Sequence, residues 1–221
     1  MIAAELLSEI IPAIHKDDIA NEALNWMDVF KVSHLPIVEG DEYLGIISDA
    51  DIIDKNSPET PVCSHQLSLQ RPYVKIDQHI FEIVDLISKF KLTVVPVLDE
   101  KDKYAGVITV IDLAHELSHL MSAENPGGIL ILELKTNDYS LSEIAQIIEG
   151  NDTKILSLYV RSDKTSDNVN ITIKLNRTDI SAVIQTFERY SYKIKAIFAD
   201  SEEIDSMLKD RLDSFFKYLN I

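Results

Sequence analysis

The sequence predicts an α+β protein in which one small unit of helices and short strands occurs twice and a different unit follows. Three observations point to this class. A pattern of apolar, glycine, proline and carboxylate positions returns after 60 residues. Apolar residues fall at helical spacing between short β-branched runs. The pattern changes after Pro-Gly-Gly at 126–128, and 221 residues suffice for two or three small units.

The repeat begins at Pro12-Ala-Ile14, which aligns with Pro72-Tyr-Val74 at an offset of 60. One extra residue in a turn of the second copy then makes the offset 61. From there, Gly45-Ile-Ile-Ser48-Asp-Ala-Asp51 aligns with Gly106-Val-Ile-Thr109-Val-Ile-Asp112. Because residue types agree in one order over about 45 residues, we interpret the pattern as a true duplication.

Each copy predicts strand, helix, strand, strand, helix. Apolar residues at helical spacing predict the first helix of each copy, and β-branched runs around a polar turn predict a hairpin. The expected helices cover 19–31 and 80–90, and the hairpin strands 35–38, 44–47, 94–98 and 104–108. A second helix is expected after Ser48 and after Thr109. The polar run 55–70 reads as the linker, which gives units at 1–57 and 58–121.

This tandem pattern of h-P-h-h, a polar turn and G-h-h-S/T-x-x-D-h resembles a pair of cystathionine-β-synthase (CBS) domains, a Bateman module. The resemblance covers roughly residues 1–121. It implies two clefts between the repeats, and it implies that Ser48, Asp51, Thr109 and Asp112 hold the ribose and phosphate of an adenosine ligand. AMP, ATP and S-adenosylmethionine are the ligands that it suggests, and no cofactor is required.

The residues themselves allow two interpretations of the Ser/Thr-x-x-Asp pattern. In the first, the hydroxyl caps the helix, and the carboxylate lies in the first turn, where the helix dipole favours a negative charge. In the second, the same helix end receives a phosphate while the carboxylate accepts hydrogen bonds from both hydroxyls of a ribose. Lys31 and Lys91 occupy equivalent positions, and His34 lies on the same edge, so these three are candidate phosphate partners. The alternative for the lysines is an ordinary solvated position on an amphipathic helix.

Residues 129–200 predict a βαββαβ order, which is typical of a ferredoxin-like sandwich. The predicted strands are 129–135, 155–161, 169–175 and 192–198, with helical stripes at 141–148 and 180–187. Leu141-Ser-Glu-Ile-Ala145 resembles the first helix of an ACT domain, and a CBS pair followed by an ACT domain resembles the acetoin-utilisation B-type proteins. Both module types self-associate in their families, so the resemblance implies a homodimer.

Two ligand classes are disfavoured for this third unit. In ACT domains a glycine before the first helix lets an amino acid approach the backbone, and here that position holds Tyr139, whose ring blocks the approach. RNA recognition on this topology needs aromatic residues on the central strands, and 129–135 and 169–175 contain none. A sheet-pairing dimer module is the favoured interpretation.

Residues 201–221 predict an amphipathic C-terminal helix. The apolar positions fall at helical spacing, at Ile204, Met207, Leu208, Leu212, Phe215, Phe216 and Leu219. Such a face either covers the sheet of its own domain or meets a second chain, and covering a core is the commoner case.

His115-Glu-Leu-Ser-His119 matches the H-E-x-x-H pattern of zinc peptidases, in which both histidines share one helix face. His115 and His119 are therefore weak candidate metal ligands. Three features count against a zinc peptidase. The pattern lies in the closing helix of the second repeat, the extended pattern fails at Ser122 and Asn125, and the only helical carboxylate downstream lies in another domain.

Charge and composition restrict the partners. The formal net charge of −16, from 37 acidic and 21 basic residues, disfavours nucleic acid and anionic membrane surfaces. One cysteine, Cys63, fits a reducing compartment, and no signal-peptide or membrane-spanning pattern is found. We therefore expect a non-catalytic, cytoplasmic regulatory protein that senses a small adenosyl ligand. The alternative is a structural or dimerisation module without a ligand, and the remote alternative is the zinc peptidase.

Overall fold

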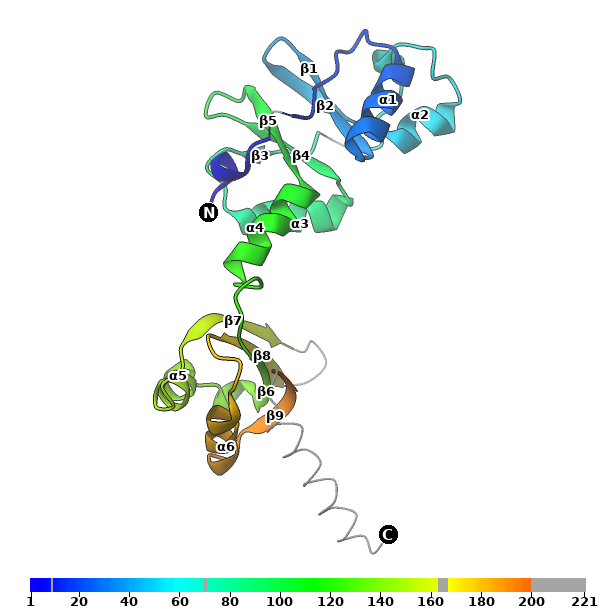
Figure 1. Cartoon of the computed structure of the whole chain (residues 1–221). Coiled ribbons are helices and arrows are strands. Elements are labelled where there is room, and N and C mark those ends of the chain that lie inside the picture. Colours follow the sequence, from blue (N-terminus) through cyan, green and yellow to red (C-terminus); the bar gives the residue numbers. More distant parts are fainter. Residues whose placement is uncertain (9, 70, 163–166, 200–221) are drawn as a thin grey trace, which may run out of the picture. The chain divides into compact units, whose positions relative to one another are not determined.

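The computed structural model describes residues 1–8, 10–69, 71–162 and 167–199, and it divides into two compact units, Met1–Glu116 and Leu117–Ile221 (Figure 1). The predicted C-terminal amphipathic helix lies outside the described residues. No described helix combines the length and the apolar character that crossing a membrane requires. The mixed helix-and-strand class predicted from the sequence is confirmed.

The first unit contains the duplicated elements. The first copy consists of α1 (Ala20–Phe30), β1 (His34–Glu39), β2 (Glu42–Ser48) and α2 (Asp49–Lys55). The second consists of β3 (Val74–Lys75), α3 (Ile80–Phe90), β4 (Val94–Leu98), β5 (Tyr104–Thr109) and α4 (Val110–Leu120). The hairpins and helices of both copies are confirmed. The first strand of the first copy is reduced to one parallel bridge, between Ile14 and Ile37, where the second copy has β3 paired with β4.

Local backbone features confirm that the copies are equivalent. α1 and α3 both end at a lysine with left-handed backbone, Lys31 at φ 54° and Lys91 at φ 58°. Each hairpin contains a register shift at matching positions, between Ile37 and Val38 and between Val97 and Leu98. Side chains from both copies meet in one apolar cluster around Val38, Tyr43 and Leu98. The duplication in the sequence is therefore a duplication of backbone conformation.

The N-terminal segments of the two copies are exchanged. The 3₁₀ turn η1 (Ala3–Leu6) packs on the second copy, where the Ala3 and Ala4 N–H groups donate to the carbonyls of Gln78 and Ile76, both at 2.9 Å. The matching turn η2 (Val62–Ser64) packs on the first copy, where Val62 N–H donates to the Asp18 carbonyl at 2.8 Å. The run 55–70 is thus more than a linker, because its turn is part of the packing of the first repeat.

The second unit is a four-stranded antiparallel sheet with two helices. Its elements are β6 (Ile129–Lys135), the 3₁₀ turn η3 (Thr136–Asp138), α5 (Leu141–Glu149), β7 (Ile155–Ser162), β8 (Asn168–Leu175), α6 (Ser181–Arg189) and β9 (Lys193–Phe198). The strand order β7-β8-β6-β9 is that of a ferredoxin-like sandwich and confirms the predicted βαββαβ unit.

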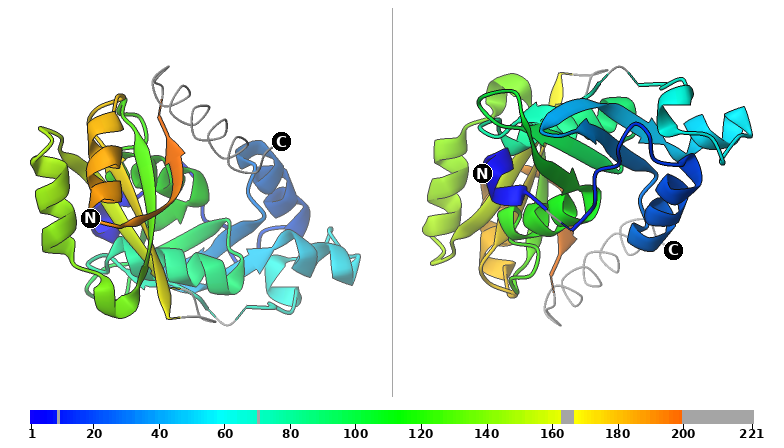
Figure 2. Two further views of the ribbon diagram at one scale, coloured as in Figure 1. Left: turned by 90° about the horizontal axis from the view of Figure 1, so that it is seen from below. Right: turned by 90° about the horizontal axis from the view of Figure 1, so that it is seen from above.

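One face of this sheet carries both helices, as the two views of Figure 2 show. Along β8, side chains alternate between buried and half-buried, because every second residue points to the helix layer. The core contains Leu130, Leu132, Ile144, Ile148, Val169, Ile171, Ile173, Val183, Ile184 and Phe187. The opposite face of the sheet is built from the alternate strand residues.

Candidate functional site

The predicted site in the first repeat is a reciprocal helix cap at the start of α2. Ser48 N–H donates to Asp51 Oδ2 at 2.9 Å, and Asp51 N–H donates to Ser48 Oγ at 3.1 Å. Ser48 is buried and Asp51 is half-buried. This arrangement satisfies orphan donors of the helix end, which is the capping interpretation. It also fixes the orientation of the Asp51 carboxylate.

A cavity lies beside that carboxylate. Its volume is about 670 Å³, within the usual range for small-molecule sites. The lining residues are Asp51, Asp54, Lys55, Ser64, Gln66, Leu67 and Ser68. Asp51 and Asp54 come from one face of α2, since they are three residues apart. The other wall is the exchanged segment of the second repeat.

The exchanged segment makes direct contact with Asp51. Ser68 N–H donates to Asp51 Oδ1 at 3.1 Å, so each carboxylate oxygen already accepts one hydrogen bond. A carboxylate offers about four lone-pair positions, and the remaining ones leave capacity for further donors. His65, with 6% of its surface exposed, has its Nδ1 3.3 Å from the Asp51 carbonyl and anchors the same segment.

The cap of the second repeat uses the same residue types with a different bond. Asp112 N–H donates to Thr109 Oγ1 at 3.0 Å, and the Thr109 hydroxyl donates to Asp112 Oδ2 at 2.7 Å. Thr109 is buried and Asp112 is half-buried. The predicted pairs therefore occupy equivalent helix starts.

Two of the predicted cations, Lys31 and Lys91, are the C-terminal caps of α1 and α3. Lys31 forms an exposed ion pair with Asp28 at 2.8 Å. Lys91 N–H donates to the Ile87 carbonyl at 2.8 Å. Both backbones adopt the left-handed conformation that commonly ends a helix. These caps give both lysines a structural role.

His34 lies where the two repeats meet. Its Nδ1 is 3.0 Å from Thr93 Oγ1, and Thr93 N–H donates to the same nitrogen at 3.3 Å. Burial lowers the pKa of His34, while the carboxylates of Asp49 and Asp51 act in the opposite direction. A neutral imidazole that accepts the Thr93 N–H fits this environment.

His115 and His119 lie four residues apart on α4. His119 forms an ion pair with Glu124. Among the residues that the structure describes, no group of three His, Cys, Asp or Glu side chains is arranged to hold a metal ion.

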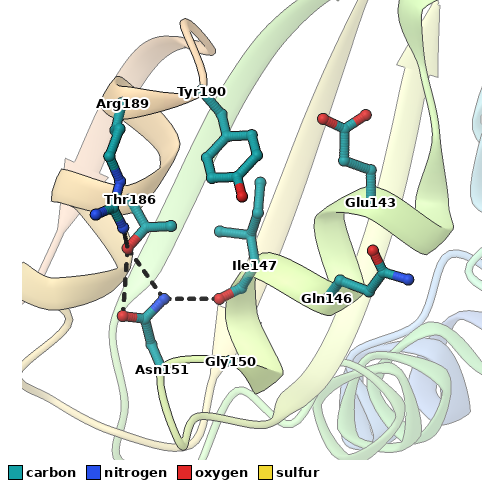
Figure 3. A pocket seen from close by; sticks show the side chains of 8 residues that line it. All are labelled: Glu143, Gln146, Ile147, Gly150, Asn151, Thr186, Arg189 and Tyr190. Carbon is teal, nitrogen blue, oxygen red and sulfur yellow. Dashed lines mark hydrogen bonds between the residues drawn. The ribbon is translucent and has the colours of Figure 1, made fainter.

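A smaller cavity, of about 210 Å³, lies between α5 and α6 of the second unit (Figure 3). Asn151 Nδ2 donates to the Ile147 carbonyl at 2.7 Å and to Thr186 Oγ1 at 3.2 Å. Arg189 donates to the same hydroxyl at 3.3 Å. These groups bond to one another and join the two helices, and the volume is below that usual for a nucleotide-sized ligand.

The turn before α5 has no need of glycine. Tyr139 has φ −75°, and its ring packs against the core of the second unit. Ser140 Oγ accepts from Glu143 N–H at 3.4 Å and begins the helix. Tyr139, whose ring is expected to block the approach of an amino acid to the backbone, is therefore also part of the core packing.

Sequence reasoning missed the wall of the Asp51 cavity. A signal was present, since Leu7-Ser8 and Leu67-Ser68 are separated by the repeat offset of 60. Both segments lie against equivalent glycines: a Cβ at Gly45 would be 2.9 Å from Leu67 Cδ1, and one at Gly106 would be 3.2 Å from Leu7 Cδ2. The repeat therefore begins upstream of Pro12.

Comparison with known families agrees with this geometry. Residues 3–57 and 67–119 match the family model described as CBS domain. This part of the chain is a tandem pair of CBS domains. Over 152 residues the chain is 23% identical to an inosine-5'-monophosphate dehydrogenase of Methanocaldococcus jannaschii, covering 67% of this chain and 30% of that protein. The chain thus spans less than a third of that relative's length.

Two solved structures are similar to about half of the chain. A CBS domain pair/ACT domain protein from Thermotoga maritima is 18% identical with a TM-score of 0.49, covering 54% of this chain and 98% of that one. CBSX2, solved in complex with AMP, is 16% identical with a TM-score of 0.46, covering 54% and 97%.

Proposed function

We propose that the protein is a non-catalytic, regulatory ligand sensor, and that its CBS pair binds an adenosine-containing molecule beside Asp51. The observation that carries the proposal is the cavity of about 670 Å³ next to an oriented, half-buried carboxylate. A nucleoside or nucleotide matches this volume. AMP, ATP and S-adenosylmethionine are the candidate ligands.

In this proposal Asp51 accepts hydrogen bonds from the ribose hydroxyls. Its orientation is set in advance by the N–H groups of Ser48 and Ser68, which reduces the ordering cost of binding. The start of α2 supplies the positive end of a helix dipole. Thr109 and Asp112 would serve a second cleft in the same way, and Lys31, Lys91 and His34 remain candidate phosphate partners.

A specific observation favours a second function, a structural module without a ligand. Both caps are complete within the chain, because each hydroxyl and carboxylate already bonds to the other or to a main-chain N–H. Capping alone would preserve the same residues. The two functions predict different responses to added ligand.

Thermal unfolding and calorimetric titration with AMP, ATP and S-adenosylmethionine separate them. A ligand at about 100 times its Kd stabilises the folded chain by about 2.7 kcal/mol, which raises Tm. Asp51→Asn should then weaken binding about tenfold or more, because a hydrogen bond to a charged group contributes about 1.5–3 kcal/mol. Absence of any Tm shift with all three compounds would support the structural module.

Asp49→Asn is the matched control. Asp49 lies in the same first turn, its carboxylate accepts a hydrogen bond from the neighbouring Ala50 N–H at 2.7 Å, and it does not line the cavity. This variant removes a charge at the helix end while leaving the proposed ribose acceptor in place. Equal loss of affinity in Asp49→Asn and Asp51→Asn would contradict the role of Asp51. Asp112→Asn tests the second cleft.

We also propose that the second unit is an ACT-like self-association module and that the protein is a cytoplasmic homodimer. The Leu141–Ala145 stretch opens α5, and the outer strand β7 exposes Tyr159 and Val160. Exposed strand edges commonly pair with another chain. Light scattering of the purified full chain should give twice its mass of 25.0 kDa.

A further inference from the structure

The face of the second-unit sheet opposite α5 and α6 is basic, although the chain as a whole is acidic. Alternation along the strands places five cationic side chains on this face, and one carboxylate, that of Glu133. The cations are Lys135, Arg161, Lys174, Lys193 and Lys195. They contrast with a net charge of −16 for the whole sequence.

The carboxylate is not enough to neutralise this face. Glu133 forms ion pairs with both Lys193 and Lys195, and its pKa is lowered mainly by its hydrogen bond with Lys193. Lys195 also donates to Asn170 Oδ1 at 2.9 Å. Lys135, Arg161, Lys193 and Lys195 are exposed and lie toward one end of the sheet, whereas the half-buried Lys174 lies at the other end, opposite Ile129.

The same face has an apolar part on the two neighbouring strands β6 and β9. Ile129 pairs with Phe198, and Ile131 pairs with Ala196. Phe198 is 58% exposed, while both isoleucines are half-buried. The segment before β6 reaches only one end of the sheet, where Ser157 Oγ donates to the Met121 carbonyl and Lys174 Nζ to the Gly127 carbonyl, at 2.8 and 2.9 Å. No described helix of this unit covers the rest (Figure 2).

We propose that this face is the docking site of the chain's own C-terminal segment, residues 201–219. That segment begins two residues beyond β9 in the sequence, and the side chain of Phe198 at the end of β9 belongs to the apolar part of the face. The proposal commits to this occupant within the same molecule and is independent of nucleotide binding by the CBS pair.

The sequence of the segment is complementary to the face. Its apolar residues recur at helical spacing, and five carboxylates accompany three cations, at Glu202, Glu203, Asp205, Asp210 and Asp213 against Lys209, Arg211 and Lys217. A helix of this length would be about 28 Å long, close to the roughly 26 Å of an eight-residue strand. The apolar stripe thus matches the apolar strip of the face, and the net charge of the segment, −2 from its five carboxylates and three cations, is opposite in sign to that of the face.

Single-stranded nucleic acid is the other occupant that a basic sheet face suggests. The aromatic residues of this face, Tyr159 and Phe198, lie on the two outer strands. The central positions are Ile131 and Thr172, which offer no ring for base stacking. The overall negative charge also opposes a polyanion at long range. The observations therefore favour the acidic segment of the chain itself.

Disulfide trapping in the full chain tests the proposal. In a Cys63→Ser background, which removes the only cysteine, Thr172→Cys on the centre of the face is combined with Leu208→Cys in the apolar stripe. Mild oxidation should give an intramolecular disulfide, seen by mass spectrometry and by faster migration on a non-reducing gel. Cross-links found only between two chains would overturn the proposal.

Two matched controls sharpen the result. Position 206 falls on the side of the predicted helix away from the apolar stripe. Ser206→Cys should therefore cross-link to Thr172→Cys at least fivefold more slowly than Leu208→Cys does. Gln185→Cys, exposed on α6 of the helix layer, should likewise react slowly with Leu208→Cys. Equal rates for all pairs would show that the segment has no preferred position and would overturn the proposal.

Charge reversal and a nucleic-acid probe complete the test. Lys195→Glu should slow formation of the cross-link between Thr172→Cys and Leu208→Cys several-fold. Added salt should have the same effect in the protein that keeps Lys195. Unchanged rates would remove the electrostatic part of the argument and with it the choice of occupant. A fluorescent oligothymidylate should not bind at physiological ionic strength, and binding lost in Lys195→Glu would assign the face to nucleic acid instead.

Discussion

The two CBS repeats share their two helices and their hairpin in the same order, yet the exchanged segments that pack against them make different contacts. Against the first repeat lies Leu67-Ser68, which touches Gly45 by the end of a flexible side chain and binds Asp51 through the Ser68 N–H. Against the second lies Leu7-Ser8, which pairs with Val107 through main-chain bonds of 2.8 and 3.4 Å. One exchanged segment binds a carboxylate, and the other forms an antiparallel bridge with a strand.

Under the proposed function, this difference makes the first repeat the better candidate for binding the ligand. In the first repeat a ribose hydroxyl can donate to the lone pairs of Asp51 that the Ser48 and Ser68 N–H groups leave unused, without breaking any backbone pairing. A segment held by reciprocal backbone bonds cannot leave without exposing unpaired polar groups. The two repeats therefore have similar backbones, and the exchanged segments give their helix starts different surroundings.

The largest expected difference is at the two equivalent glycines. Gly106 has φ +143°, and a Cβ there would be 3.3 Å from the Ser8 carbonyl oxygen, so Gly106→Ala combines backbone strain with a rigid contact. We expect a loss of about 2–3 kcal/mol in the free energy of unfolding. Gly45→Ala meets only Leu67 Cδ1, which can rotate, and should cost below about 1 kcal/mol.

Urea unfolding followed by Trp26 fluorescence measures this pair of variants. Trp26 is the single tryptophan of the chain and lies on α1, so its signal reports on the CBS unit. A Gly45→Ala loss equal to or larger than that of Gly106→Ala would contradict the contrast between a flexible and a backbone contact.

The helices and strands of both units can be predicted from sequence periodicity, whereas the contacts of the exchanged segments cannot. The helix at 80–90 is predicted to the residue, because its apolar stripe is a local feature of the sequence. The bond from Ser68 to Asp51 joins residues that are 17 apart, and it depends on how the repeats pack. His65 illustrates the same limit, because it is buried by the packing of the exchanged segment against the first repeat.

The helix caps give a smaller contrast between the repeats. Thr109 Oγ1 both accepts from Asp112 N–H and donates to its carboxylate, whereas Ser48 Oγ accepts from Asp51 N–H. We expect Thr109→Ala to lower the free energy of unfolding by about 2 kcal/mol and Ser48→Ala by about 1 kcal/mol. Thr109→Ser and Ser48→Thr, which keep the hydroxyl, are the controls. Equal losses for the two alanine variants would show that the donated bond contributes nothing.

The smallest expected effect concerns His34, whose equivalent in the second repeat is the non-titrating Val94. Burial holds the pKa of His34 below its ordinary value, and the carboxylates of Asp49 and Asp51 partly offset that effect. Because the folded-state pKa is the lower one, the unfolded chain binds more protons in the interval between the two values. The stability that His34 contributes is therefore complete above about pH 6.5, the ordinary histidine value, and decreases as the pH falls below it.

His34→Gln should remove this pH dependence while keeping a polar group near Thr93. The free energy of unfolding of the unchanged chain should fall relative to that of the variant as the pH is lowered from 7.5 toward 5, measured by urea unfolding at each pH with Trp26 fluorescence. The direction is the decisive quantity. A difference that stays constant, or that grows with rising pH in favour of the variant, would mean that burial does not keep the His34 imidazole neutral where the repeats meet.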